Sequence, residues 1–172
     1  EMEGRLTSVY EIPEKDQILT SRKEYYHHQV KLSPNGNLLA YTSNYNGKYR
    51  VYIRDLENSK ETLVLTGGHK VINQEIDYEI PLVAWRGNNT LGIITSEQGN
   101  YYLWTYEIDS KHKQKKEFDR FSHIQSLDFS ENGNLAIFSA ERDGQSDLYV
   151  YSLRRNAVKR ITNDLYDDVD AK

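Results

Sequence analysis

The chain has 172 residues, a length that supports one domain with a sizeable core. Its net charge of −4 gives no electrostatic footprint for nucleic acid, and no segment approaches the roughly 18 consecutive apolar residues of a membrane helix. The absence of cysteine excludes disulfides and thiol chemistry. We therefore expect no nucleic-acid partner and no insertion into a membrane.

The first complete unit of a repeated pattern covers residues 21–66, and residues 1–20 resemble the back half of such a unit. Short runs rich in Val, Ile, Tyr, Thr and Leu alternate here with turn signals, as in β-strands. Asn46-Gly47 is a strong hairpin dipeptide because a type I′ turn needs positive φ at both central residues. Four strands are predicted, near residues 29–32, 38–43, 49–55 and 61–66.

The second unit, residues 67–118, is the least regular copy and carries an insertion at residues 67–80. Gly99 marks its central hairpin. Asn88 stands 11 residues earlier, where the other units have a glycine. Because Asn tolerates positive φ better than other non-glycine residues, we expect Asn88 to fill that turn position. Four strands are predicted, near residues 81–85, 90–95, 101–107 and 114–118.

The third unit, residues 119–162, repeats the first closely. Residues 130–133 read Ser-Glu-Asn-Gly where residues 33–36 read Ser-Pro-Asn-Gly, and Asp143-Gly144 takes the place of the first hairpin dipeptide. Residues 163–172 match the start of a further unit. Four strands are predicted in the third unit, near residues 125–129, 135–139, 146–152 and 158–162.

The spacing within the units indicates the fold. Gly36 and Gly47 are 11 residues apart, as are Gly133 and Gly144. In all three units the hairpin glycine precedes by 5 residues an aromatic that we expect to pack between units: Tyr52, Trp104 and Tyr149. Four-stranded antiparallel units of about 45 residues in series are the blades of a β-propeller, whereas a single sandwich has no reason to repeat a four-strand phrase. We predict an all-β, partial propeller over residues 1–172, with about three full blades and half-blade remnants.

The repeat resembles that of TolB-type propellers. The resemblance rests on residues 33–36, Leu39-Ala40-Tyr41, Asn46-Gly47, Val51-Tyr52 with the acidic Asp55, and Leu65-Thr66. It implies a bacterial periplasmic or cell-envelope protein that binds a protein partner. The same blade also occurs in the gating propellers of prolyl-oligopeptidase-like enzymes, so the resemblance is specific for the fold and not for the function.

The chain contains no nucleophile elbow, zinc-binding helix, Walker loop or dinucleotide fingerprint. We therefore predict a non-catalytic scaffold that binds a protein or a glycan, needs no cofactor, and obtains its missing blades from a longer chain or by oligomerisation. The alternative is the propeller portion of a larger peptidase whose active site lies outside these residues. A propeller enzyme with a channel metal is a weaker third possibility, because Lys31, Arg86 and Asp128 are a poor ligand set for one cation.

Segments that break the repeat are the candidate binding loops, since a packing residue is needed in every blade and a binding residue only once. They are residues 67–80 and the segment before the first strand, although a long loop that covers a neighbouring blade explains them equally well. Adjacent His27 and His28 point to opposite faces of an extended segment, which argues against a shared metal. The candidate residues are Tyr25, Tyr26, His27, His28, His69, Lys70, Asn73, Asp77 and Tyr78.

Overall fold

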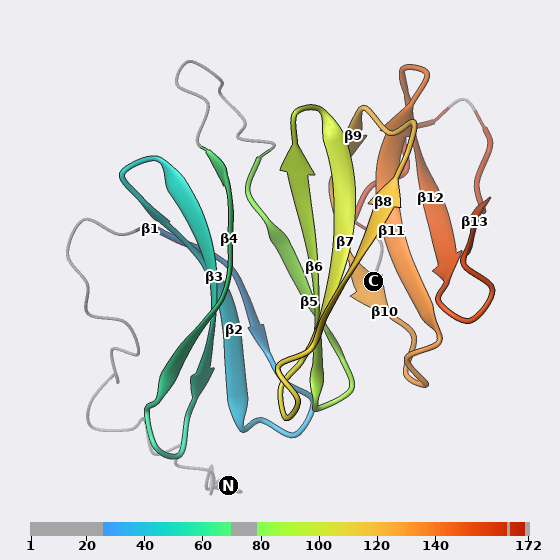
Figure 1. Ribbon diagram of the computed structural model, residues 1–172. Helices are drawn as coiled ribbons and strands as arrows, with labels where there is room; N and C mark the ends of the chain where they lie inside the picture. The colour runs from blue at the N-terminus through green and yellow to red at the C-terminus, as the bar shows by residue number, and fades with distance from the viewer. Residues whose placement is uncertain (1–25, 70–78, 165, 171–172) are drawn as a thin grey trace, which may run out of the picture.

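The computed structural model describes residues 26–69, 79–164 and 166–170, and this part of the chain contains strands and no helix. Three antiparallel sheets follow one another along the chain and stack side by side (Figure 1). We call them the first, second and third blades. Their strands are β1 (Tyr26–Leu32), β2 (Leu38–Tyr45), β3 (Lys48–Asp55) and β4 (Glu61–His69); β5 (Leu82–Arg86), β6 (Thr90–Glu97), β7 (Asn100–Glu107) and β8 (Lys113–Phe118); and β9 (His123–Ile124), β10 (Asp128–Phe129), β11 (Leu135–Arg142), β12 (Gln145–Ser152) and β13 (Ala157–Arg160).

Each blade is a meander in which sequential strands pair. The strand orders are β1-β2-β3-β4, β5-β6-β7-β8 and β10-β11-β12-β13, with the short β9 pairing to β11. Among the described residues no backbone ladder pairs strands of different blades, so every sheet is a separate unit. The predicted all-β fold class, built from four-stranded antiparallel blades, is confirmed.

Type I′ turns connect the two middle strands of the first and third blades. Asn46 and Gly47 have φ of 52° and 72°, and Asp143 and Gly144 have φ of 56° and 80°. The second blade uses Gln98-Gly99 in the same way, with φ of 54° and 83°. Positive φ at both positions gives the turn the right-handed twist of the strands that it joins.

The turn after the inner strand explains the repeated Ser-x-Asn-Gly phrase. Ser33 Oγ donates to Asn35 Oδ1 at 2.8 Å and accepts from the Leu38 amide at 2.9 Å. Ser130 repeats both contacts in the third blade, to Asn132 at 2.9 Å and from Leu135 at 3.1 Å. The phrase therefore encodes a turn closed by its own side chains.

The second blade closes this turn differently from our prediction. Positive φ falls on Gly87, at 65°, and not on Asn88. Arg86 pairs with Thr90, whereas Leu32 pairs with Leu39, so the second turn is shorter. The expectation that Asn88 fills the left-handed position was wrong because the shorter turn moves that position onto the preceding glycine, which has no Cβ.

The blades bury both faces of the second sheet. On β5, Val83 and Trp85 join a core with the first blade, while Leu82 and Ala84 join a core with the third. Alternation along an extended strand produces this division, because successive side chains point to opposite faces. The strand β5 contacts both β1 and β10, so the three inner strands lie next to one another.

The repeated aromatic faces the preceding blade. Trp104 packs against the core between the first and second blades, and Tyr149 belongs to the core between the second and third. Tyr52 stacks on Tyr41 at 5.6 Å on the face of the first blade that points away from the second. Packing between blades, as predicted, is thus shown for Trp104 and Tyr149.

The innermost strand of the third blade is interrupted. In place of one strand over residues 125–129, β9 and β10 pair separately with β11. Between them, Ser126 Oγ lies 2.7 Å from Ser139 Oγ and accepts a hydrogen bond from the Ser139 amide at 3.1 Å. This side-chain bond takes the place of a backbone hydrogen bond between the strands. Residues 1–20 lie outside the described residues, and the described part of residues 163–170 contains no strand.

Candidate binding site at the inner strands

One cavity draws its walls from all three blades. It has a volume of about 460 Å³ and lies where β1, β5 and β10 end and their turns begin. Residues more than 90 positions apart in the chain therefore meet around a single hollow, as in ligand sites at the centre of a propeller. The lining residues are Lys31, Leu32, Pro34, Ala84, Trp85, Gly87, Asn88, Asp128, Phe129, Ser130 and Glu131.

The cavity combines charges of both signs with apolar surface. Lys31 comes from the first blade, and Asp128 and Glu131 come from the third. Leu32 lies beside Lys31 and is 55 % exposed, so it adds apolar surface to the cavity. Such a surface offers an ammonium group, two carboxylates and an apolar contact to one ligand.

Hydrogen bonds from the second blade fix the walls of the cavity. Trp85 Nε1 donates to the Lys31 carbonyl at 2.9 Å, and Asn88 Oδ1 accepts from the Asn35 amide at 2.9 Å. On the other side, Arg86 Nε donates to the Gly133 carbonyl at 2.6 Å. The second turn thus holds both neighbouring turns, and the site is formed before any ligand arrives.

The serine in this cavity belongs to the fold. The contacts of Ser130 to Asn132 and Leu135 close the turn after β10, and none of them involves a histidine or carboxylate base. A nucleophilic serine needs such a base within hydrogen-bond reach. Among residues 26–69, 79–164 and 166–170, no group of three or more His, Asp or Glu side chains is placed to hold a metal ion.

Of the residues predicted from sequence as binding loops, those at the start of β1 lie away from this cavity. Tyr26, His27 and His28 are at the start of β1, whereas the cavity is at its end. His27 packs edge-on to Tyr41 at 5.3 Å and His28 edge-on to Tyr49 at 6.5 Å, on opposite faces of the sheet.

His69 is the last residue of β4, where its backbone pairs with Lys48. The remaining candidates lie outside the described residues and stay predictions: Tyr25, Lys70, Asn73, Asp77 and Tyr78.

Sequence reasoning considered Lys31 and Asp128 only as ligands of a channel metal, and it treated the turns around the cavity as marks of the repeat, so it did not identify their common hollow. One signal was available, because residues 85–88 (Trp-Arg-Gly-Asn) depart from the Ser-x-Asn-Gly phrase of the other units. Trp85, Arg86 and Asn88 are the residues that make the contacts between blades. The same criterion of repeat-breaking features that selected the insertion thus also applies to residues 85–88.

The fold of this chain is similar to that of TolB structures. No family model matches the chain, and no curated protein matches it. Among solved structures, TolB from Acinetobacter baumannii superposes with a TM-score of 0.70 and 17% identity, covering 91% of this chain and 37% of that one. A putative TolB from Agrobacterium tumefaciens has a TM-score of 0.65 and 18% identity, covering 82% of this chain and 48% of that one.

Propellers of proteolytic enzymes are similar as well. A prolyl endopeptidase structure has a TM-score of 0.60 and 15% identity, covering 91% of this chain and 25% of that one. The propeller domain of the Trilobed protease from Pyrococcus furiosus has a TM-score of 0.61 and 12% identity, covering 86% and 46%. The chain spans less than half the length of each of these proteins. Its fold is a TolB-like β-propeller.

Within the described residues, none of the elements is a helix that is long and apolar enough to pass through a membrane.

Proposed function

We propose that the chain is a non-catalytic β-propeller scaffold that binds a protein partner through the cavity at its inner strands. The observation that carries this proposal is that three blades contribute to one preformed hollow. The likeness to TolB structures supports a place in the bacterial periplasm or cell envelope.

The charges of the cavity suit a polypeptide ligand. Lys31 complements an acidic side chain of a partner, while Asp128 and Glu131 complement a basic one. Leu32 offers an apolar contact in the same cavity. A neutral glycan, the other ligand considered from the sequence, presents no charge to match these three groups.

Site-specific photo-crosslinking tests the proposal. A photoreactive phenylalanine derivative replaces Leu32, which is 55 % exposed in the cavity, and in a second protein it replaces Leu63, which is 50 % exposed on β4. We expect a discrete protein adduct from position 32 and none of the same mass from position 63. Mass spectrometry of the adduct identifies the partner.

Two charge-reversal variants test whether the charged groups of the cavity take part in binding. Lys31→Glu and Asp128→Lys are each expected to reduce the yield of the adduct at position 32 at least tenfold, because like charges then face each other. Circular dichroism checks that both variants remain folded. The same adduct from both positions, or unchanged yield in both charge variants, would refute binding through this cavity.

A second function is favoured by the peptidase likeness, since the prolyl endopeptidase structure covers 91% of this chain. Under this reading the chain is the propeller portion of a larger hydrolase whose active site lies elsewhere. The neighbouring coding sequence discriminates the two: an α/β-hydrolase region with a nucleophile elbow supports the peptidase, and further blades behind a secretory signal support the scaffold.

A further inference from the structure

A second cavity lies at the seam between the second and third blades, on the outer strands and away from the inner site. Its volume is about 270 Å³, and its walls come from β8, from β11, β12 and β13, and from the segment that links the two blades. Four cationic side chains line it, against two carboxylates. The cations are Lys116, Arg120, Arg142 and Arg160, and the carboxylates are Glu117 and Asp119.

Tyr149 forms part of the wall and carries an unsatisfied polar group. The side chain is 2 % exposed, and its hydroxyl has no hydrogen-bond partner within the described part of the chain. The ring is held edge-on to Phe121 at 4.8 Å and stacked on Phe138 at 5.7 Å, so it cannot turn toward solvent. A buried hydroxyl without a partner is costly and uncommon in folded proteins.

Burial, two arginines and two carboxylates act on the pKa of this hydroxyl. Burial raises the pKa of Tyr149, while the charges of Arg160 and Arg142 act in the opposite direction and those of Asp147 and Asp143 reinforce the rise. The hydroxyl therefore remains a proton donor at neutral pH. It lies within the field of two guanidinium groups.

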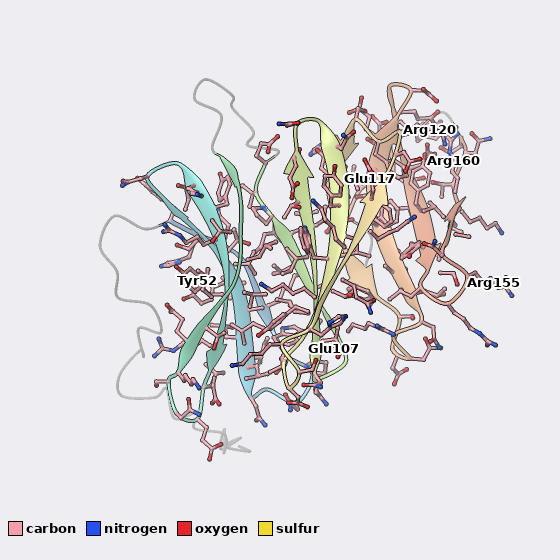
Figure 2. All side chains as sticks on the ribbon, viewed as in Figure 1. Tyr52, Glu107, Glu117, Arg120, Arg155 and Arg160 are labelled. Carbon is pink, nitrogen blue, oxygen red and sulfur yellow. The ribbon has the colours of Figure 1, made fainter. Side chains whose placement is uncertain are left out.

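The arginines retain donors for a ligand. Arg160 forms an ion pair with the fully buried Asp147, which fixes its side chain beside Tyr149. Arg142 approaches Asp143 at 3.6 Å, but that carboxylate is 91 % exposed and weakly held. Arg120 is exposed and forms no ion pair among the described residues. Figure 2 shows Arg120, Arg160 and Glu117 at the same end of the seam, and Arg155 at a separate tip of the third blade.

We propose that this seam cavity binds a small oxyanion, a phosphate or a carboxylate group. In this site Arg120 and Arg142 supply charge, and the Tyr149 hydroxyl donates the hydrogen bond that it otherwise lacks. Phosphate and carboxylate oxygens are the acceptors that guanidinium groups match best. Glu117 and Asp119 oppose binding and restrict it to ligands that reach past them. The proposal does not depend on the partner of the inner cavity.

Titration of the nitrogen-labelled protein, followed by nuclear magnetic resonance, tests the site. Inorganic phosphate, acetate and chloride are added separately at constant ionic strength, and the arginine Nε and backbone resonances are monitored. We expect saturable shifts around the seam with phosphate or acetate, with a Kd on the order of 1 mM, and none with chloride. The tighter of the two oxyanions identifies the class of ligand.

Four variants assign the binding to these residues. Tyr149→Phe keeps the ring and removes only the hydroxyl, and Arg120→Gln keeps an exposed polar side chain; each is expected to weaken binding about tenfold. Glu117→Gln is expected to strengthen it two- to threefold. Arg155→Gln, a matched exposed arginine outside the cavity, is expected to leave the affinity unchanged.

Two results would overturn the proposal. One is a wild-type response to the oxyanions no larger than that to chloride. The other is an affinity in Tyr149→Phe and Arg120→Gln that equals the wild-type affinity. Should Tyr149→Phe alter the fold, Arg120→Gln decides alone, because its exposed side chain supports no core.

Discussion

Tyr101 is a buried phenol on β7, and its environment makes the protein sensitive to alkali. Burial raises its pKa from 10.0 to about 12, with smaller contributions in the same direction from Glu79 and Glu141, while contacts to the Ile124 backbone and Ser96 act in the opposite direction. The folded protein therefore keeps this proton in a range where the unfolded chain has lost it. The free energy of unfolding must fall as pH rises through that range.

We expect the free energy of unfolding to fall by about 2–3 kcal/mol between pH 10 and pH 12 on account of Tyr101, since each pKa unit corresponds to about 1.4 kcal/mol. Burial also raises the pKa of Tyr149 and of Tyr151, which adds to the slope. Urea unfolding at several pH values measures it. Tyr101→Phe should flatten the profile, whereas Tyr166→Phe, at a side chain 78 % exposed, should not. Equal slopes in Tyr101→Phe and wild type would contradict this assignment.

Single residues were predicted well where the reason for them is local. The hairpin dipeptides and the Ser-x-Asn-Gly turns follow from the φ angles and side-chain hydrogen bonds of neighbouring residues. The left-handed position in the second blade was misassigned to Asn88, because a shortened turn is invisible when only glycine spacing is compared. The cavities were missed because their walls join residues from different blades, and no local pattern records that meeting.

At the scale of strands, the seam between the second and third blades depends on one glycine. A Cβ at Gly92 of β6 would lie 2.3 Å from Cε2 and 2.5 Å from Cζ of Phe129 on β10. Phe129 is only 9 % exposed and belongs to the core of the seam, so its ring has little room to retreat. Two strands of different blades approach closely here because one of them has no side chain.

Gly92→Ala is expected to lower the free energy of unfolding by about 1–3 kcal/mol through overpacking. Gly67→Ala is the matched control, since its nearest neighbour would be Thr95 Cγ2 at 3.9 Å, an ordinary contact; it should change the stability by less than about 0.5 kcal/mol. Phe129→Leu in the Gly92→Ala background should recover part of the loss. A Gly92→Ala variant as stable as the control would show that the blades separate without cost.

The sequence predicted where strands lie better than it predicted whether a strand is interrupted. The alternating apolar pattern gave β3, β7 and β12, each of which has both neighbours in its sheet. The same pattern predicted one strand over residues 125–129, where the structure has β9 and β10 instead. The side chain of Ser126 takes a ladder position there, and a serine hydroxyl is not distinguishable by pattern from an ordinary exposed strand residue.

At the scale of the whole molecule, the third blade has a sheet face with no blade against it among the described residues. Apolar side chains on this face alternate with those of the seam, and two of them are exposed, Leu135 at 36 % and Ile161 at 52 %. The remaining members are half-buried: Ile137, Leu148 and Val150. An apolar sheet face of this kind is usually covered by a neighbouring blade or by another molecule.

We therefore expect the isolated chain to associate in solution, with a mass by light scattering above the 20.1 kDa of one copy. A double variant, Leu135→Lys with Ile161→Lys, should shift the mass toward 20.1 kDa because buried ammonium groups oppose contact between such faces. Val158→Lys is a control at a side chain 42 % exposed on the opposite face. A compact wild-type monomer would contradict the expectation that this face needs a cover.

The contacts made by Trp85, Arg86 and Asn88 bear on how such a gene can evolve. Each of these side chains reaches a carbonyl or amide of an adjacent blade, and the corresponding turns of the flanking units have no indole or guanidinium to offer in exchange. A recombined gene with its units in another order would preserve every ladder and still lose these links. The order of the units is therefore fixed by these side chains, and exchanging two units is expected to cost stability.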